Sequence, residues 1–331
     1  LVDALRRAVA DAAGDARHAR AAGPDGATPA PRDRILAERA RPVVKVQDGC
    51  DGTCAFCVVP SVRGPAASVP LADVQAAVAR AAARGAAEVV LAGIDLASWG
   101  RDRGEGDVAA LLAALVAMGT GMRFRLSSIE PRGLDRRLLD RVGTCPDVCP
   151  HLHVAVQSGS DRVLAAMRRP DDAGELARRL ADARARIPGL ALGLDVICGF
   201  PGEDEDDFAR TVALVQAAGA DALNVFPFSP RPGTAAARMR DDVPPAVKAR
   251  RVAHLRALSD RARRMRAASW IGRSVEVVDV GRPRDGRVAS VAADGTPVVR
   301  DDPRGPRRGR FLLHVHAADG PTAVAATPEH A

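Results

Sequence analysis

The sequence predicts an α/β fold built on a parallel sheet, followed by a small all-β domain. Three observations lead to this prediction. Short apolar segments alternate with helical stretches from residue 43 to residue 267. Helical periodicity then stops, and short strands separated by Gly, Pro and Asp turns take over. The chain has 331 residues, of which 47% are hydrophobic, enough to build one large core and one small one.

Six candidate strands of the larger domain are short, apolar and mostly followed by a polar or glycine-bearing turn. They cover residues 43–47, 88–91, 123–127, 151–156, 190–197 and 222–226. The helical stretches between and after them cover 71–84, 108–117, 134–141, 160–186, 203–218 and 244–267, with a break expected at Pro170. Strands that alternate with helices favour a parallel sheet. In barrels built from alternating parallel strands and helices, ligand sites lie at the carboxyl ends of the strands.

Both ends of the chain differ from this alternating region. Residues 1–13 and 33–39 have a helical pattern, and the Ala, Gly and Pro-rich stretch 21–31 between them has the composition of a linker. Strands are expected at 275–280, 287–292, 296–299 and 311–315. We therefore divide the chain into residues 1–41, an α/β domain at 42–268 and an all-β domain at 269–331.

The charge balance is compatible with a polyanionic partner such as RNA. The net charge is +7, and of the 48 basic residues only Lys45 and Lys248 are lysines. Part of the arginine excess is a compositional bias and carries no functional message. No apolar run reaches the roughly 20 residues that are needed to span a bilayer, so no membrane partner is expected.

The most informative local feature is a cysteine-rich loop directly after the first strand. Cys50, Cys54 and Cys57 have C-x3-C-x2-C spacing, with Phe56 just before the last cysteine. A cubane [4Fe-4S] cluster normally takes four cysteine ligands, so three thiolates leave one iron open to bind a small molecule. A cluster held by thiolates implies a reducing compartment, and we expect the protein to be cytoplasmic.

Two other interpretations of these cysteines remain open. A zinc site needs a fourth ligand, and Cys145, Cys149, His151 and His153 are the available donors. A disulfide framework fits poorly with only six cysteines in a chain of this length.

The cysteine loop resembles the signature loop of radical S-adenosylmethionine (SAM) enzymes. In that superfamily the open iron chelates the amino and carboxylate groups of SAM. The resemblance implies that the α/β domain is an open (β/α)6 partial barrel, with Cys50, Cys54 and Cys57 as the metal ligands and as the catalytic centre.

Further stretches resemble one family within that superfamily, the radical SAM methylthiotransferases. They are found at residues 45–50, 126–131, 149–153, 157–164, 195–203 and 224–234, and the resemblance extends from about residue 42 to residue 272. The Ser-Ser-Ile-Glu-Pro sequence at 127–131 is most similar to the tRNA enzymes that act on N6-threonylcarbamoyladenosine next to the anticodon.

The resemblance implies cofactor contacts at the ends of the second and third strands. Gly93 and Asp95 lie where the family holds the amino group of SAM, although an ordinary turn at the end of a strand explains them as well. Ser128 and Glu130 offer hydroxyl and carboxylate partners for ribose or substrate. Capping of a turn before Pro131 is the alternative for these two residues.

Cofactor contacts are also expected at the fourth and fifth strands. Gln157 and Ser158 are placed to meet the SAM carboxylate or the substrate. Asp195 and the turn that begins at Gly199 are placed near the adenosine part of SAM. Phe56 completes this set of expected cofactor contacts.

The family implies a reaction and its partners. Reduced cluster cleaves SAM to a 5′-deoxyadenosyl radical, which takes hydrogen from C2 of the target adenine before a methylthio group replaces it. The expected partners are tRNA, at its anticodon region, and a reductant such as flavodoxin or ferredoxin.

A second [4Fe-4S] cluster assembles the methylthio group in that family, on three cysteines of an N-terminal domain. No cysteine precedes Cys50. We therefore interpret residues 1–41 as a remnant of that domain with its linker. We expect this chain to bind one cluster and cleave SAM without inserting sulfur.

The all-β domain resembles the small RNA-binding TRAM barrel that ends these enzymes. Two arginine clusters suit phosphate contacts, at 261–266 and 304–310. Two other functions remain open: a sister enzyme acting on isopentenyladenosine in tRNA or on an aspartate of a ribosomal protein, and a fragment that binds RNA without catalysing a reaction.

Overall fold

The computed structural model describes residues 41–280, 285–302 and 305–326. The helices and linker expected within residues 1–40 lie outside this range, and so does Arg304. Within the described part, no helix combines the length and the apolar character that a membrane span requires.

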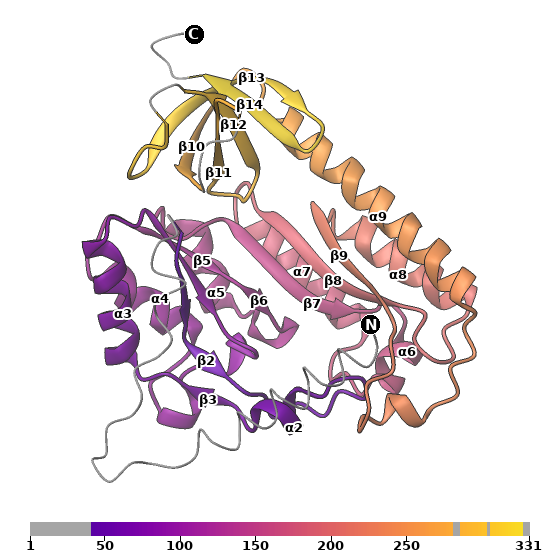
Figure 1. Ribbon diagram of the computed structural model, residues 1–331. Helices are drawn as coiled ribbons and strands as arrows, with labels where there is room; N and C mark the ends of the chain where they lie inside the picture. Colours follow the sequence, from indigo (N-terminus) through magenta and orange to yellow (C-terminus); the bar gives the residue numbers. More distant parts are fainter. Residues whose placement is uncertain (1–40, 281–284, 303–304, 327–331) are drawn as a thin grey trace. The chain divides into compact units, whose positions relative to one another are not determined.

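The larger domain is built on parallel strands in two connected sheets (Figure 1). The first sheet has the order β1-β4-β5 and the second has the order β6-β7-β8-β9. Only Ser127 separates β5 from β6, so the two sheets are joined through the chain itself. The strands are β1 (Val43–Lys45), β4 (Glu88–Ala92), β5 (Arg123–Leu126), β6 (Ser128–Ile129), β7 (His151–Gln157), β8 (Ala191–Cys198) and β9 (Ala222–Pro227).

The predicted parallel α/β domain is confirmed, with one difference at the third strand. That strand is split into β5, which pairs with β4, and β6, which pairs with β7. An isolated bridge between Phe124 and Val148 also links β5 to the segment just before β7. Strands β1 and β9 each pair on one side in the described structure, so the barrel is open between them.

Helices connect these strands close to the predicted positions. They are α3 (Leu71–Ala83), α4 (Val108–Val116), α5 (Arg136–Thr144), α6 (Asp161–Ala166), α7 (Ala173–Arg186), α8 (Glu205–Ala217) and α9 (Pro245–Ala268). The break expected at Pro170 separates α6 from α7. Short polar side chains fix several helix starts: Ser160 and Asp172, for example, each accept a hydrogen bond from a backbone N–H in the first turn.

Three short elements near the cysteines were not predicted. Helix α2 (Val59–Arg63) follows the cysteine loop directly. Strands β2 (Gln47–Asp48) and β3 (Ala67–Ser68) pair antiparallel and bracket the loop and this helix. These elements are too short to produce a periodic pattern in the sequence.

The core of the α/β domain is formed by aliphatic side chains from both layers. Leu91, Leu152 and Leu194 from the strands are fully buried and belong to the same apolar cluster as Leu176 and Leu180 of α7. Helices cover the outer face of these parallel strands, and the filled interior covers the other face. The strands are therefore buried on both sides, which explains their continuous apolar sequence. Figure 1 shows α7 and α8 behind β7, β8 and β9.

Residues 274–326 form a closed five-stranded barrel in the order β10-β11-β12-β14-β13. Its strands are β10 (Ser274–Asp279), β11 (Arg287–Ala292), β12 (Pro297–Asp301), β13 (Phe311–Asp319) and β14 (Thr322–Ala326). The all-β character is as predicted, but the sequence analysis missed β14. That strand is mostly alanine, a residue that is depleted in strands, and it pairs only because closure of the barrel covers both of its edges.

A buried ionic network joins the two domains. Glu88 of β4 accepts from Arg123 Nε at 2.6 Å and from Arg125 Nε at 2.7 Å. The same arginines donate to the carbonyl oxygens of Val291 and Ala292 in β11, at 2.8 and 3.1 Å. Because Glu88 is fully buried, its carboxylate depends on these two guanidinium groups for solvation.

We predict that Glu88→Gln destabilises the protein by about 3–5 kcal/mol at neutral pH, because it leaves the buried Arg125 without its counter-charge and Arg123 with only the more exposed Glu276. Burial alone raises the pKa of Glu88, but Arg125, Arg123 and Arg41 together hold it below its ordinary value of 4.5. The ionised group therefore stabilises the fold above about that pH, and this contribution is lost as the pH falls through the lowered pKa. Urea denaturation from pH 7 to pH 3 should show the difference between wild type and variant shrinking with acid.

The matched control is Asp140→Asn, which removes a carboxylate that forms exposed ion pairs with Arg136 and Arg186. It should cost no more than about 1 kcal/mol. Equal losses for the two variants would contradict the importance of the buried network.

Candidate functional site

The cysteine loop is held in place by backbone hydrogen bonds. Cys50 N donates to Gly64 O at 3.1 Å, which closes the loop on itself. Ala55, between the second and third cysteines, donates its N–H to Met167 O at 2.9 Å and accepts from Ala236 N at 2.7 Å. The loop is thus anchored on one side to the end of α6 and on the other to the segment after β9.

All three loop cysteines are free and partly exposed. Backbone N–H groups point at two of the sulfurs: Gly52 N lies 3.2 Å from Cys50 Sγ, and Val59 N lies 3.4 Å from Cys57 Sγ. Burial raises the pKa of the Cys50 and Cys57 thiols. These thiols therefore hold their protons until a metal replaces them, and the N–H donors then stabilise the thiolates.

The arrangement of donor side chains fits a cluster better than a zinc ion. In the part of the chain that the structure describes, no three His, Cys, Asp or Glu side chains surround one metal position. A tetrahedral zinc ion requires such a convergence, whereas a cubane takes each thiolate on a different iron. The zinc donors considered above also differ in accessibility: Cys149 is buried, and burial raises its pKa to about 12.

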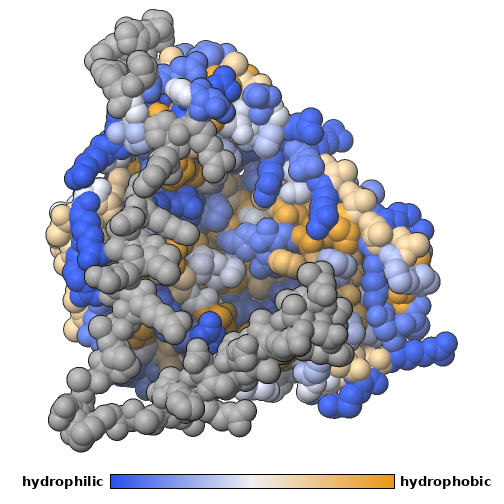
Figure 2. Space-filling model, viewed as in Figure 1, coloured by the Kyte–Doolittle hydropathy of each residue, from blue (hydrophilic) through white to orange (hydrophobic). Residues whose placement is uncertain are grey.

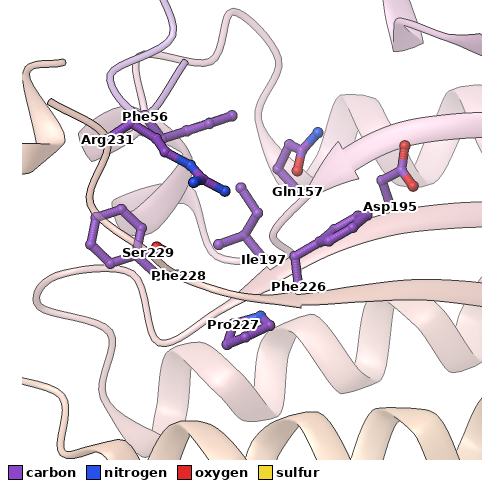
Figure 3. Close-up of a pocket in the computed structure, with 9 residues that line it drawn as sticks. All are labelled: Phe56, Gln157, Asp195, Ile197, Phe226, Pro227, Phe228, Ser229 and Arg231. Carbon is purple, nitrogen blue, oxygen red and sulfur yellow. The ribbon is translucent and has the colours of Figure 1, made fainter. Parts of the chain in front are cut away.

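A pocket of about 270 Å³ lies beside this loop, at the carboxyl ends of β7, β8 and β9 (Figure 3). Phe56 and Arg231 are at one end of the view, and Gln157 and Asp195 are at the other. The full lining is Phe56, Gln157, Asp195, Ile197, Phe226, Pro227, Phe228, Ser229 and Arg231. Hydrophilic and hydrophobic side chains both line the hollow in the middle of the face seen in Figure 2.

Gln157 has an unusual backbone conformation where β7 ends. Its φ is +67°, in the left-handed region that non-glycine residues rarely adopt, and the register of β7 on β8 shifts just before it. This conformation places the Gln157 side chain in the pocket. Strain of this kind is concentrated at functional sites, where the surrounding structure maintains it.

Ser158, the next residue, is not among the residues that line the pocket. Its side chain is buried, its Oγ lies 3.2 Å from Thr211 Oγ1, and it accepts from Ser160 N at 3.2 Å. The expected cofactor contact at Ser158 therefore differs from what the structure shows, because the turn at Gln157 directs the hydroxyl toward α8. No residue pattern around Gln157 predicts a left-handed backbone there.

Asp195 is held by two neighbours that the sequence analysis did not place at the cofactor site. Its Oδ1 lies 2.7 Å from His153 Nε2 and 3.0 Å from Asn224 Nδ2. The three side chains come from the adjacent strands β7, β8 and β9. Gly193 makes room for this arrangement, since a Cβ there would lie 2.4 Å from His153 Nδ1. Period-two alternation along each strand was the sequence signal that could have grouped them.

Gly199 supports the pocket from behind and does not line it. Its φ is +71°, and a Cβ at this position would lie 2.4 Å from Lys248 Cγ. The Lys248 ammonium pairs with Asp241 and lies 5.3 Å from the centroid of the Phe228 ring. The glycine is thus required by the close approach of Lys248, and its expected position beside the adenosine part of SAM stays a prediction.

Gln47 connects the cysteine loop to the end of β4. Its Oε1 accepts from Asp95 N at 2.8 Å, and its Nε2 donates to Gly49 O at 3.0 Å. A Cβ on Gly93 would lie 3.0 Å from the Gln47 side chain, so this glycine makes room for the glutamine, and its contact with SAM stays a prediction.

Asp95 keeps one carboxylate oxygen free. Its Oδ2 pairs with Arg132, while its buried Oδ1 has no hydrogen-bond partner among the described residues. An unpartnered buried acceptor is costly unless a donor reaches it. An ammonium group at this position would satisfy it.

Glu130 and Ser128 are not among the residues that line the pocket: Glu130 acts on Cys50 and Cys57, and Ser128 lies opposite His153 of β7. Ser128 is exposed at the start of β6. Glu130 pairs with Arg169 at 2.5 Å, and Arg169 Nη1 lies 3.6 Å from Cys54 Sγ. The sequence analysis missed Arg169, because an arginine between two helices has no distinctive pattern.

Comparison with known proteins agrees with this site. Residues 44–215 match the family model described as the radical SAM superfamily. The chain belongs to the radical SAM superfamily. The barrel also resembles coproporphyrinogen III oxidase (HemN) from Escherichia coli, a radical SAM enzyme, with a TM-score of 0.50 and 18% identity over 68% of this chain and 54% of that one. At this identity the likeness bears on the fold alone.

Two curated relatives are more similar in sequence. The tRNA-2-methylthio-N(6)-dimethylallyladenosine synthase of Aromatoleum aromaticum is 38% identical over 281 residues, covering 83% of this chain and 63% of the relative. The synthase of the same name from Chloroflexus aurantiacus is 39% identical over 246 residues, covering 73% of this chain and 53% of the relative. The chain thus spans less than two thirds of the length of either relative.

The cofactors of this radical SAM chain are a [4Fe-4S] cluster and SAM, and the observed residues fit both. The three loop thiols suit the cluster. The free oxygen of Asp95 suits the ammonium group of SAM. The aromatic and polar lining of the pocket, with Gln157 and Asp195, suits its adenosine part.

We predict that Gln157→Ala raises the Kd for SAM about tenfold, because a lost hydrogen bond to a charged or polar ligand group costs about 1.5 kcal/mol. Ser158→Ala, one residue away, should stay within about twofold of wild type, since its hydroxyl bonds only to protein groups. Anaerobic calorimetric titration of the reconstituted protein measures both values. The reverse order of effects would show that the turn at Gln157 is oriented differently when SAM binds.

We also predict that Cys54→Ala abolishes cluster binding. Wild-type protein should hold about four irons and four sulfides per chain after anaerobic reconstitution, and the variant should hold far less. Cys145→Ala is the matched control and should bind as wild type does. A wild-type value near eight, or a loss on replacing Cys145, would instead point to a second cluster on this chain.

Proposed function

We propose that this chain is the radical SAM core of a tRNA methylthiotransferase, and that its substrate is isopentenyladenosine in tRNA. The observation that carries the proposal is the cysteine loop anchored beside a nucleoside-sized pocket at the carboxyl ends of the strands. The choice of substrate is supported by the names of the relatives, since dimethylallyl and isopentenyl denote the same five-carbon group.

When bound, the cluster and SAM supply one-electron cleavage of SAM and hence a radical able to remove hydrogen from an adenine C–H bond. The residues of the chain bind, orient and exclude water. Asp95 accepts the ammonium of SAM on its free oxygen. Gln157 and Asp195 orient the adenosine part, and His153 and Asn224 hold Asp195 in place. Phe56, with the other aromatic rings of the pocket, keeps water away from the reacting atoms.

The proposal replaces N6-threonylcarbamoyladenosine, the substrate favoured by the Ser-Ser-Ile-Glu-Pro sequence, with the alternative. That preference depended on residues 127–131. Of these, Ile129 is buried in the core and Glu130 is paired with Arg169. Since these contacts serve the barrel and the cysteine loop, the motif carries little information about the group attached to N6 of the adenosine.

The five-stranded barrel supports a role in binding tRNA, as its resemblance to TRAM suggests. Two arginines of the loop at residues 305–310 already form ion pairs within the protein. Arg310 pairs with Asp147 and Glu276, and Arg307 pairs with Asp302. The exposed arginines of the two arginine clusters are better placed to meet phosphates. They are Arg261, Arg263 and Arg264 of α9, together with Arg308. A small reductant protein of the flavodoxin or ferredoxin type and a cytoplasmic location complete the proposal.

We predict that the chain alone, reduced with dithionite, converts SAM to 5′-deoxyadenosine and methionine but yields no methylthiolated tRNA. The second cluster expected for sulfur insertion needs three cysteines ahead of the barrel, and no cysteine of this chain precedes Cys50. Chromatography with mass detection measures the nucleoside products, and Cys54→Ala is the control that should give no 5′-deoxyadenosine.

The substrate is tested with the protein purified from its source cells. Incubation with tRNA that carries isopentenyladenosine should give its 2-methylthio derivative, and tRNA that carries N6-threonylcarbamoyladenosine should remain unchanged. Modification of the second substrate alone would restore the original preference. Modification of neither, with SAM cleavage intact, would point to a substrate outside tRNA.

A further inference from the structure

Arg169 occupies a position that the proposed function does not explain. It follows α6 directly and precedes Pro170, and its side chain is 4% exposed. Nη2 bonds to Glu130 Oε2 at 2.5 Å and to Ala155 O at 2.9 Å, while Nη1 lies 3.6 Å from Cys54 Sγ. A planar guanidinium held at two points has little freedom to turn away from the third.

The orientation of Arg169 results from the fold around it. Helix α6 ends at Ala166, and Arg168, whose φ is +57°, turns the chain out of the helical path just before Arg169 and Pro170. Arg169 N bonds to Leu164 O at 2.9 Å, and Met167 O accepts from Ala55 N of the cysteine loop. The same short segment thus anchors the loop through its backbone and reaches one of its sulfurs through a side chain.

Arg169 differs from the other groups around the sulfurs. Backbone N–H groups point at Cys50 and Cys57. Among the described residues, Arg169 is the only side chain that donates to a loop sulfur, and it is the donor recorded for Cys54. The negative groups that act on the loop are Asp95 near Cys50 and Glu130 near Cys50 and Cys57, and Asp95 is paired with Arg132.

A buried cation with an N–H directed at a thiolate ligand favours the reduced cluster. Reduction adds an electron to the cluster, and hydrogen bonds to its sulfurs stabilise the added negative charge. Glu130 neutralises much of the charge of Arg169 at long range. Glu130 also fixes the guanidinium group of Arg169 so that its other N–H points toward Cys54. The short-range hydrogen bond to the sulfur is therefore retained. Burial keeps solvent from screening this contact.

We propose that Arg169 is a positioning residue that raises the reduction potential of the cluster through its hydrogen bond to Cys54. Glu130 holds Arg169 in the required orientation. The inference depends on the cluster bound by the three cysteines, and it does not depend on the identity of the nucleic acid substrate.

The test is a redox titration of the anaerobically reconstituted chain, followed by electron paramagnetic resonance with SAM omitted. SAM is omitted so that its own charges do not contribute to the measured potential. Arg169→Ala should lower the equilibrium constant for one-electron reduction about tenfold, which is a shift of about 59 mV to more negative potential. Arg169→Gln, which keeps an N–H donor without the charge, should fall between the alanine variant and wild type.

Arg168→Ala is the matched control, because it removes the same charge from the adjacent, exposed residue. It should leave the potential unchanged. Iron and sulfide content is measured for every variant, so that potentials are compared only between proteins with a full cluster. If Arg169→Ala fails to assemble one, Arg169→Gln and Arg169→Lys still provide the comparison.

A fully loaded Arg169→Ala or Arg169→Gln protein with the wild-type potential would overturn the proposal. An equal shift in Arg168→Ala would overturn it as well, because the change in potential would then come from the loss of a nearby positive charge and not from the hydrogen bond to Cys54. Both results are independent of tRNA modification. The inference about Arg169 therefore stands or falls separately from the proposed substrate.

Discussion

The site depends on how the two backbone groups of Ala55 are engaged. Its N–H donates to Met167 and its carbonyl accepts from Ala236, so the loop that carries the cysteines is held between the end of α6 and the segment after β9. These two segments lie far apart in sequence, and the barrel brings them to the same edge. Without this anchoring, a loop of small and polar residues would have no reason to hold three thiols toward one ligand. The pocket would also lack Phe56 as one of its walls.

Paired charges let this barrel place polar groups where an aliphatic core would otherwise exclude them. Glu88 with Arg123 and Arg125 connects the amino end of the sheet to β11, and Glu130 with Arg169 orients a cation toward a cysteine. Glu88, Arg123, Arg125 and Arg169 are buried and Glu130 is partly buried, so the buried charges depend on their partners for stability. The first pair has a structural role, and the second lies where the chemistry takes place. A protein with few aromatic residues thus relies on arginine for contacts of fixed direction.

Much of the fold was predictable because the elements are regular. The strands β4, β8 and β9 begin and end within one residue of their predicted bounds, since apolar runs bounded by turns define buried strands well. The split between β5 and β6, the short helix α2 and the alanine-rich β14 were not predictable. Each of these depends on partners distant in sequence: a bend in the sheet, the anchored loop, and the closure of a barrel around a strand of low propensity.

For the site, the sequence by itself determined the chemistry. The spacing of Cys50, Cys54 and Cys57 defines a cluster loop, and the polar residues after the strands define the edge at which a ligand binds. Only the tertiary structure decided which of those polar residues face the pocket. The left-handed backbone at Gln157 brings that residue into the pocket and takes Ser158 out of it. The approach of Lys248 explains Gly199, and the break after α6 brings Arg169 to Cys54. The physical reason is that spacing along the chain fixes which atoms are available, whereas backbone conformation and packing fix the direction in which they point.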